Sequence, residues 1–341
     1  MPKSPLERLQ LGFAGAHGCP RPHLSVDGMT PAGPNLSHWP GNRTPLPWRA
    51  DLSTAIALRC ARASHAAQAA FLGDAELVVN DHYDTDGFGS LLAVLRPAVA
   101  FAHEELLLAA AATGDFGTWQ SPRAFAIDRT IVGLGAPTSP VAAEVAAADD
   151  AAGALRRYRW LLEHAERLLR EPESFATIFA DERALVAEEL DRGLRGDVAV
   201  QRWPALGFTL LTTTGPRHRM TLNTLAGAHR VLHAATARDG MRFRYHDRTE
   251  SWFALVTTAV LPRLDLWPIA ARLGELEPPR DGARWCADPP TEPIPELYFG
   301  VPAAQAYGQI TRELRPSRLR ADQVAGELAR AFAAPLVPPG T

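Results

Sequence analysis

The chain has 341 residues, of which 46 % are hydrophobic and 21 % are charged, a composition typical of globular rather than disordered proteins. Its formal net charge is −3, from 35 basic and 38 acidic side chains, which excludes a generally basic nucleic-acid binder. Lys3 is the only lysine and stands beside the N-terminus, so Schiff-base chemistry and a Walker-type phosphate loop are excluded.

Cysteine usage and hydropathy predict a cytoplasmic protein. Cys19, Cys60 and Cys286 are odd in number, far apart and form no CxxC pair, so a reduced compartment is expected. The longest apolar stretches, such as residues 106–112, are far shorter than the roughly 20 residues that cross a bilayer. We therefore expect no membrane partner.

The first half of the chain predicts short strands and several helices. Residues 1–50 are rich in Pro, Gly, Asn and Ser and are expected to be irregular with short strands. Residues 51–70 have helical apolar spacing, and residues 75–80 form a short apolar run typical of a buried parallel strand. Further helices are expected at residues 91–95 and 98–112.

The second half predicts a mixture of helices and strands. The expected helices are residues 153–170, 181–195, 222–237 and 320–333. The expected strands are residues 197–203, 208–213 and 241–245, while residues 253–260 fit a strand or a helix. In the helix at 222–237, His229 and His233 would share one face and be half-buried.

This order of elements predicts an α/β fold, with a mainly parallel sheet flanked by helices and a second α+β portion. We expect an α/β portion at residues 1–135, a linker or connecting arm at 136–152, and a substrate-binding portion at 153–335. Residues 1–150 hold 10 basic and 15 acidic side chains (net −5), and the rest hold 25 and 23 (net +2). This split suits a metal site in the first part and anion binding in the second.

The most informative segment is VVNDHYDTDGFGS at residues 78–90. His82, Asp84 and Asp86 are spaced by two, so in extended backbone they would point to one side. At the carboxyl edge of a strand they would converge where open α/β sheets bind ligands. Mixed imidazole and carboxylate donors predict a divalent metal site. The alternative is an acidic turn that only caps a helix.

Three neighbouring residues extend this candidate site. Asp81 directly precedes the motif and is expected to support catalysis from beside the ligands. Ser90 is expected to begin a helix whose amides favour a substrate anion. Asp115 follows a helix and a glycine, and would add a fourth metal ligand from a turn at the same edge. A plain cap or turn role for Asp115 is equally open.

The HxDxDGxxS pattern of residues 82–90 resembles the first motif of the DHH-type phosphoesterases. The resemblance implies a pair of manganese ions, with His82, Asp84 and Asp86 among the ligands. It also implies hydrolysis of phosphodiesters, phosphoanhydrides or polyphosphate. The whole chain, in addition, resembles a family of uncharacterised bacterial proteins that share the SHWPG and HxDxDG segments.

Further candidates lie outside this motif. In the loop NLSHWPGNRT at residues 35–44, His38 could act as a ligand or general acid, while Asn42 and Arg43 could hold an anion. His218 in the second half is a candidate acid. The alternation around Arg242 and Arg244 predicts a basic strand face that binds substrate, although any half-buried strand has this pattern.

No GxSxG elbow, strand-linked GxGxxG or GxxxxGK[ST] loop occurs in the chain. We therefore expect a metal-dependent, phosphoesterase-like hydrolase of an anionic small molecule, with Mn²⁺ favoured and Fe²⁺ or Zn²⁺ possible. No Asp-His-His triplet occurs either, which keeps open a mononuclear non-haem iron enzyme for oxidation or cyclisation. A non-catalytic binding protein is the third alternative.

Overall fold

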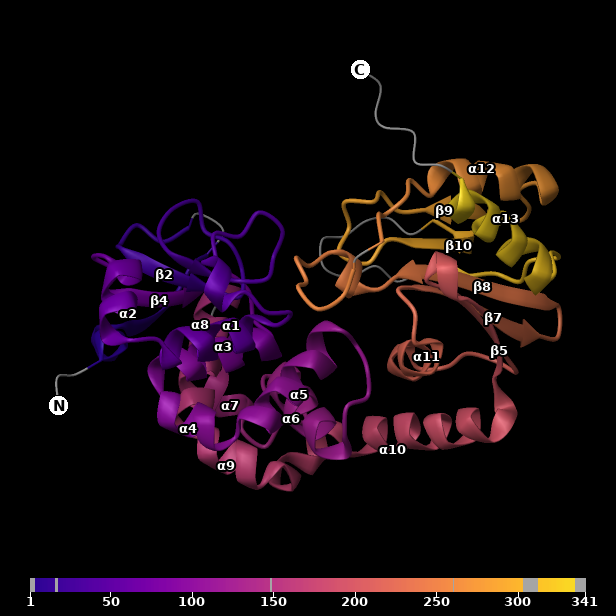
Figure 1. Cartoon of the computed structure of the whole chain (residues 1–341). Helices are drawn as coiled ribbons and strands as arrows, with labels where there is room; N and C mark the ends of the chain where they lie inside the picture. The colour runs from indigo at the N-terminus through magenta and orange to yellow at the C-terminus, as the bar shows by residue number, and fades with distance from the viewer. Residues whose placement is uncertain (1–3, 16–17, 148, 260, 303–311, 335–341) are drawn as a thin grey trace, which may run out of the picture. The chain divides into compact units, whose positions relative to one another are not determined.

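The computed structural model describes residues 4–15, 18–147, 149–259, 261–302 and 312–334 (Figure 1). The chain forms two compact units. The first comprises Met1–Ala184 and Phe253–Ala259, and the second comprises Leu185–Trp252 and Val260–Thr341. In the described parts, no helix is long and apolar enough to cross a membrane.

The first unit is built on a four-stranded sheet in which all neighbouring strands are parallel, in the order β1-β4-β2-β3. The strands are β1 (Gln10–Phe13), β2 (His23–Val26), β3 (Asn35–Leu36) and β4 (Leu77–Asn80). Both β2 and β4 are buried along their whole length. This burial agrees with the continuous apolar run that predicted a parallel strand near residue 77.

Helices pack around this sheet. They are α1 (Ser53–Arg62), α2 (His65–Leu72), α3 (Thr85–Leu95), α4 (Pro97–Ala102), α5 (Glu104–Asp115), α6 (Pro122–Val132), α7 (Ala142–Val145), α8 (Asp150–Glu163) and α9 (Ala165–Arg170). Short helical turns are Pro5–Arg8, Leu46–Trp48 and Pro172–Phe175. Helix α10 (Ala176–Arg192) contains the boundary between the units. Residues 136–152, which include α7, lie within the first unit.

Helices α1 and α3 approach each other closely because α3 carries a glycine at the contact. A Cβ atom at Gly89 would lie 2.2 Å from the Thr54 hydroxyl oxygen. That hydroxyl donates a hydrogen bond of 3.1 Å to the carbonyl of Asp86 in the first turn of α3. The close contact therefore brings the N-terminus of α1 against the beginning of α3, which follows β4.

The second unit is built on a seven-stranded mixed sheet in the order β11-β10-β8-β7-β6-β5, with β9 paired to β10. The strands are β5 (Ala199–Trp203), β6 (Phe208–Thr213), β7 (Arg230–Ala237), β8 (Gly240–Asp247), β9 (Arg284–Ala287), β10 (Glu296–Val301) and β11 (Glu313–Leu314). The helices are α11 (Arg219–Ala226), α12 (Trp267–Leu276) and α13 (Ala321–Ala333). Helical turns are Gly193–Asp197, Pro204–Leu206 and Thr249–Ser251.

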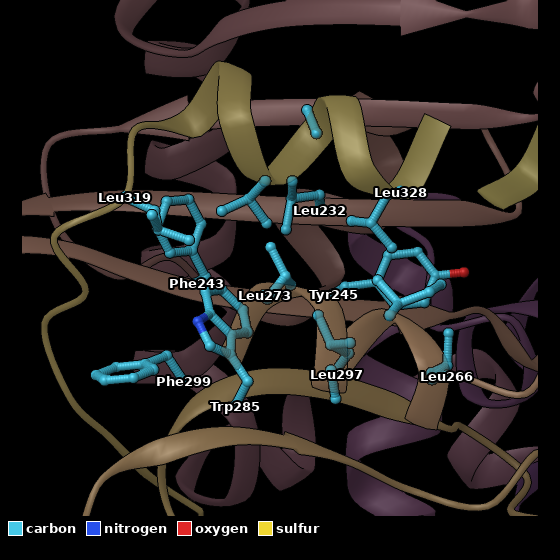
Figure 2. Close-up of a cluster of buried hydrophobic side chains, with 14 of the residues drawn as sticks. Leu232, Phe243, Tyr245, Leu266, Leu273, Trp285, Leu297, Phe299, Leu319 and Leu328 are labelled. Atoms are coloured by element: carbon cyan, nitrogen blue, oxygen red, sulfur yellow. The ribbon is translucent and has the colours of Figure 1, made fainter. Parts of the chain in front are cut away.

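The main core of this unit lies between one face of the sheet and helices α12 and α13 (Figure 2). Phe243 and Tyr245 of β8 pack there with Leu273 of α12 and Leu328 of α13. In a smaller cluster, Leu222 of α11 packs with Leu211 of β6 and Val231 of β7. The mixed sheet and its helices, beside the parallel sheet of the first unit, confirm the predicted α/β class.

Two predicted elements are wrong. Residues 222–237 are not one helix, because α11 ends at Ala226 with Gly227 in the left-handed region and β7 begins at Arg230. His229 and His233 therefore share no helix face. The sheet decides this, since β7 pairs with β6 and β8 on its two sides. Residues 253–259 form neither strand nor helix, and residue 260 lies outside the described residues.

The position of His233 in β7 predicts a pH-dependent stability. Its buried ring contacts the Thr213 hydroxyl at 2.7 Å. Burial and the charges of Arg217 and Arg244 lower the pKa of His233 to about 4. Between about pH 6.5 and pH 4 the unfolded chain therefore binds a proton that the folded chain does not. The free energy of unfolding should fall by about 2 kcal/mol at pH 5 relative to pH 7.5 from this residue.

Urea unfolding at the two pH values measures this effect. His233→Gln should reduce the loss of stability at pH 5, whereas His65→Gln, at an exposed position in α2, should not. An equal loss in the wild type and His233→Gln would contradict the assignment.

Candidate metal centre

The turn after β2 places a carboxylate beside the HxDxD segment that follows β4. Because β2 and β4 are parallel neighbours, with Ser25 opposite Val79, their carboxyl ends lie side by side. Asp27 at the end of β2 has a φ of 45°, and Gly28 has a φ of 147°. A Cβ atom at Gly28 would lie 2.2 Å from Asp81 Oδ1, so the turn requires glycine at this position.

Both carboxylate oxygens of Asp27 are buried and have no hydrogen-bond partner among the described residues. Oδ1 lies 3.6 Å from His38 Nε2, and Oδ2 lies 3.4 Å from His82 Nε2. Burial and the charges of Asp84 and Asp86 raise the pKa of Asp27 well above its ordinary value. A buried carboxylate without donors is costly, so this position requires a proton or a cation.

Asp27 is shared by two groups of potential metal ligands. In each group, the donor atoms all lie within 4.8 Å of one another. The buried ligand group consists of Asp27, His38, Asp86 and Asp115, and the outer ligand group consists of Asp27, His82 and Asp84. Imidazole with several carboxylates is a donor set that suits Mn²⁺, Fe²⁺ or Zn²⁺.

The orientation of His38 suits a potential metal ligand in the buried group. Its Nδ1 lies 2.6 Å from the backbone carbonyl of Asp51 and donates to it, which leaves the Nε2 lone pair free. Nε2 faces Asp115 Oδ2 at 3.2 Å and Asp86 Oδ2 at 3.7 Å. The side chain has no exposed surface. A histidine whose other nitrogen donates to a carbonyl is the usual arrangement at metal sites.

Asp86 is fixed by the first amides of α1. Its Oδ2 accepts from the Ser53 amide and its Oδ1 from the Thr54 amide, both at 2.7 Å. Each carboxylate oxygen has two lone pairs, so these hydrogen bonds leave capacity for a cation. The two amides therefore set the direction of the carboxylate within the buried ligand group.

His82 is oriented by Asp81 in the outer ligand group. The ring nitrogen Nδ1 lies 2.8 Å from Asp81 Oδ1, while Asp81 Oδ2 accepts from the Met29 amide at 3.0 Å. Nε2 then faces Asp84 Oδ2 at 2.9 Å. The His82 side chain is 29 % exposed, so this group, unlike the buried one, is accessible to solvent. Asp81 thus acts by holding the ring.

Tyr158 of α8 holds the turn between His82 and Asp84. Its hydroxyl donates to the His82 carbonyl at 3.0 Å and accepts from the Asp84 amide at 3.1 Å. The Asp84 side chain accepts from the Gly87 amide at 2.8 Å and so caps α3. These contacts fix His82 and Asp84, two of the three residues of the outer ligand group, through their backbone atoms.

Protonation would compensate the crowded carboxylates wherever no cation does so. Burial and the charges of Asp86 and Asp84 raise the pKa of Asp115 well above its ordinary value. Burial opposes protonation of His82, but Asp84 and the hydrogen bonds to neighbouring carboxylates raise its pKa well above the ordinary value. A divalent cation would replace these protons, so metal binding should release protons.

The structure brings together five of the sequence candidates, His38, His82, Asp84, Asp86 and Asp115. The expected geometry of the motif, however, is wrong. Residues 82–86 are not extended, because α3 begins at Thr85, so Asp86 belongs to a different ligand group from His82. The capping alternative also holds, since Asp84 caps α3 and Asp86 binds the first amides of α1.

Ser90 does not begin a helix. It lies in the middle of α3, buried, because the Asp84 cap starts the helix at Thr85. Asp115 is the last residue of α5 rather than part of a following turn. The helix start that could attract an anion is therefore at Thr85, not at Ser90.

The remaining candidates, four for substrate binding and His218 as an acid, make contacts within their own units. Asn42 closes its loop, donating to the Trp39 carbonyl at 2.8 Å, and Arg43 donates to the Thr30 carbonyl at 2.9 Å. In the second unit, His218 caps α11 by accepting from the Met220 amide at 3.2 Å. Arg242 and Arg244 are half-buried on β8, and Arg244 donates to Glu296 at 2.9 Å.

Asp27 is the potential ligand that the sequence candidates do not include. A buried run that ends in Asp-Gly, at residues 23–28, is its signal in the sequence. This signal is short, and its meaning depends on β2 lying next to β4, which are some fifty residues apart in the chain. Only the parallel pairing of these strands brings Asp27 beside His82.

Comparison with models of protein families gives a match. The chain belongs to DUF6687, a family of unknown function. The family match covers residues 11–337 and therefore both units. It confirms the expected uncharacterised family and assigns no activity. Comparisons with curated proteins and with solved structures give no match.

The position of Asp27 predicts how metal affects stability. Adding Mn²⁺ at about 100 times its Kd should raise the free energy of unfolding by about 2.7 kcal/mol, because the folded state alone assembles the ligand groups. Asp27→Asn should abolish most of this increase, since it removes the shared charge. Thermal unfolding with Mn²⁺ or EDTA measures the effect.

Asp74→Asn, at an exposed position, is the matched control and should respond to Mn²⁺ as the wild type does. Equal stabilisation of Asp27→Asn and the wild type would show that Mn²⁺ binds elsewhere.

Proposed function

We propose that the protein is a metal-dependent hydrolase that uses two divalent cations, most suitably Mn²⁺, to hydrolyse a phosphate ester or anhydride in an anionic small molecule. The observation that carries this proposal is Asp27, whose two unpartnered, buried oxygens face two different ligand groups. A carboxylate shared in this way is suited to bridging two cations. Such a pair polarises a phosphoryl oxygen and lowers the pKa of bound water.

The two ligand groups suit different tasks. The buried group has four donors with almost no exposed surface, and it is suited to holding a cation firmly. The outer group has three donors, two of them on half-buried side chains, His82 and Asp84, which leaves room for water and a substrate oxygen. His38 then serves as a ligand rather than a general acid, because its ring is enclosed by carboxylates.

The resemblance of residues 82–90 to the first motif of DHH-type phosphoesterases supports phosphoryl transfer as the reaction. Arg242 and Arg244 in the second unit stay sequence candidates for binding an anionic substrate. Because the chain has no Asp-His-His triplet, its second histidine ligand would be His38, which comes from the loop after β3.

The mononuclear iron alternative requires two histidines and one carboxylate at a single metal. Each ligand group here contains one histidine, together with two or three carboxylates. This donor set favours hard divalent cations in two positions over a two-histidine iron site. A non-catalytic binding protein would keep the fold without turnover.

Metal analysis of untagged protein purified without added metal tests these functions. We expect about two equivalents of Mn²⁺ in the wild type and a lower content in His82→Ala and Asp84→Ala. One equivalent of iron with oxygen-sensitive activity would instead favour oxidation or cyclisation. No bound metal after incubation with Mn²⁺, Fe²⁺ or Zn²⁺ would overturn both enzyme proposals.

Hydrolysis of model phosphodiesters and pyrophosphate by the Mn²⁺-loaded protein tests the reaction. His82→Ala should lower kcat by about 100-fold or more, because the outer group would lose its only imidazole. Asp74→Asn should retain full activity. A Mn²⁺-loaded wild type that hydrolyses none of these substrates, nor other phosphorylated metabolites, would contradict the hydrolase proposal.

A further inference from the structure

The segment Phe253–Ala259, called the strap here, belongs to the first unit although the chain on both sides of it belongs to the second. It has no helical or strand structure, and residues 256–259 are exposed. A segment of this kind stays in place only through specific contacts, and these contacts converge on the residues around His38.

Asp51, two residues before α1, anchors the strap. Its Oδ1 accepts from the amides of Val256 at 2.6 Å and Thr257 at 3.0 Å. Its Oδ2 accepts from the Thr257 hydroxyl. Each hydrogen bond to an ionised carboxylate is stronger than a hydrogen bond between two neutral groups. They hold the exposed part of the strap against the start of α1.

The strap also contacts His38 directly. The Ala254 amide donates to the His38 carbonyl at 2.7 Å. The Phe253 ring stacks on the His38 imidazole, with ring centroids 3.8 Å apart and planes at 17°. Since His38 Nδ1 donates to the Asp51 carbonyl, the strap and its anchor together fix the backbone, the ring plane and the tautomer of this histidine.

We propose that Asp51 and Phe253 are positioning residues that act through His38, and that docking of the strap and metal binding at the buried ligand group stabilise each other. This inference rests on the proposed function, because it requires a cation at His38 Nε2. Linkage is reciprocal, so a cation that fixes His38 must stabilise the docked strap by the same free energy.

Hydrogen exchange of the full chain measures one side of this linkage. With saturating Mn²⁺, the amides of Ala254, Val256 and Thr257 should exchange at least about tenfold more slowly than in EDTA. The Mn²⁺-dependent protection should be absent in His38→Ala and retained in Thr258→Ala, an exposed change in the same strap.

Calorimetric titration with Mn²⁺ measures the other side. Asp51→Ala and Phe253→Ala should weaken one of two binding events by about 10- to 100-fold, the usual effect of removing a group that orients a ligand. The event that depends on His82 should keep its affinity. Asp51→Asn, which retains an acceptor oxygen, should recover part of the loss.

Phe253→Leu keeps an apolar side chain without the flat ring and provides a second variant if Phe253→Ala does not fold. Two unchanged Mn²⁺ affinities in folded Asp51→Ala and Phe253→Leu would overturn the strap proposal alone. Strap amides of the wild type that exchange equally fast in saturating Mn²⁺ and in EDTA would also overturn the strap proposal alone. A wild type that binds no divalent cation would overturn the strap proposal together with the proposed function.

Discussion

The main physical constraint in the first unit is the crowding of four carboxylates, Asp27, Asp84, Asp86 and Asp115, around two imidazoles. Like charges at this separation in a buried place cannot all be ionised without compensation. The raised pKa values of Asp27 and Asp115 reflect that cost. Backbone amides, a tyrosine hydroxyl and oriented histidines offset part of this electrostatic cost. Bound divalent cations would remove the rest.

The elements around the centre have double roles that follow from this constraint. Asp84 caps α3 and Asp86 binds the first amides of α1, so the same carboxylates that offer metal ligands also begin two helices. Gly89 then allows α1 and α3 to touch, and Gly28 allows the β2 turn to lie on Asp81. Stability and the candidate site therefore depend on the same few residues, and a substitution at either carboxylate should affect both.

The candidate site was predictable in part. The run of apolar residues into HxDxDG predicts a strand followed by polar donors, and the structure places His82 and Asp84 there. The sequence also indicated His38 and Asp115, because a loop histidine and an acid that follows a predicted helix are available donors. The separation of Asp86 from His82 was not predictable from spacing, since it depends on α3 starting at Thr85. The helix expected at 222–237 failed because pairing with β6 and β8, rather than local apolar spacing, decides the conformation of β7.

By itself, the sequence determined the α/β class, the lack of a Walker-type phosphate-loop motif, and a polar segment after a buried strand. These features depend on composition and on local patterns with periods of two or a few residues. Tertiary structure alone decided that Asp27 joins the site, that one carboxylate faces two ligand groups, and that Phe253 stacks on His38. The reason is that all three depend on segments distant in the chain. Parallel pairing places β2 beside β4, and the hydrogen bonds of Asp51 hold the strap against a loop more than two hundred residues away.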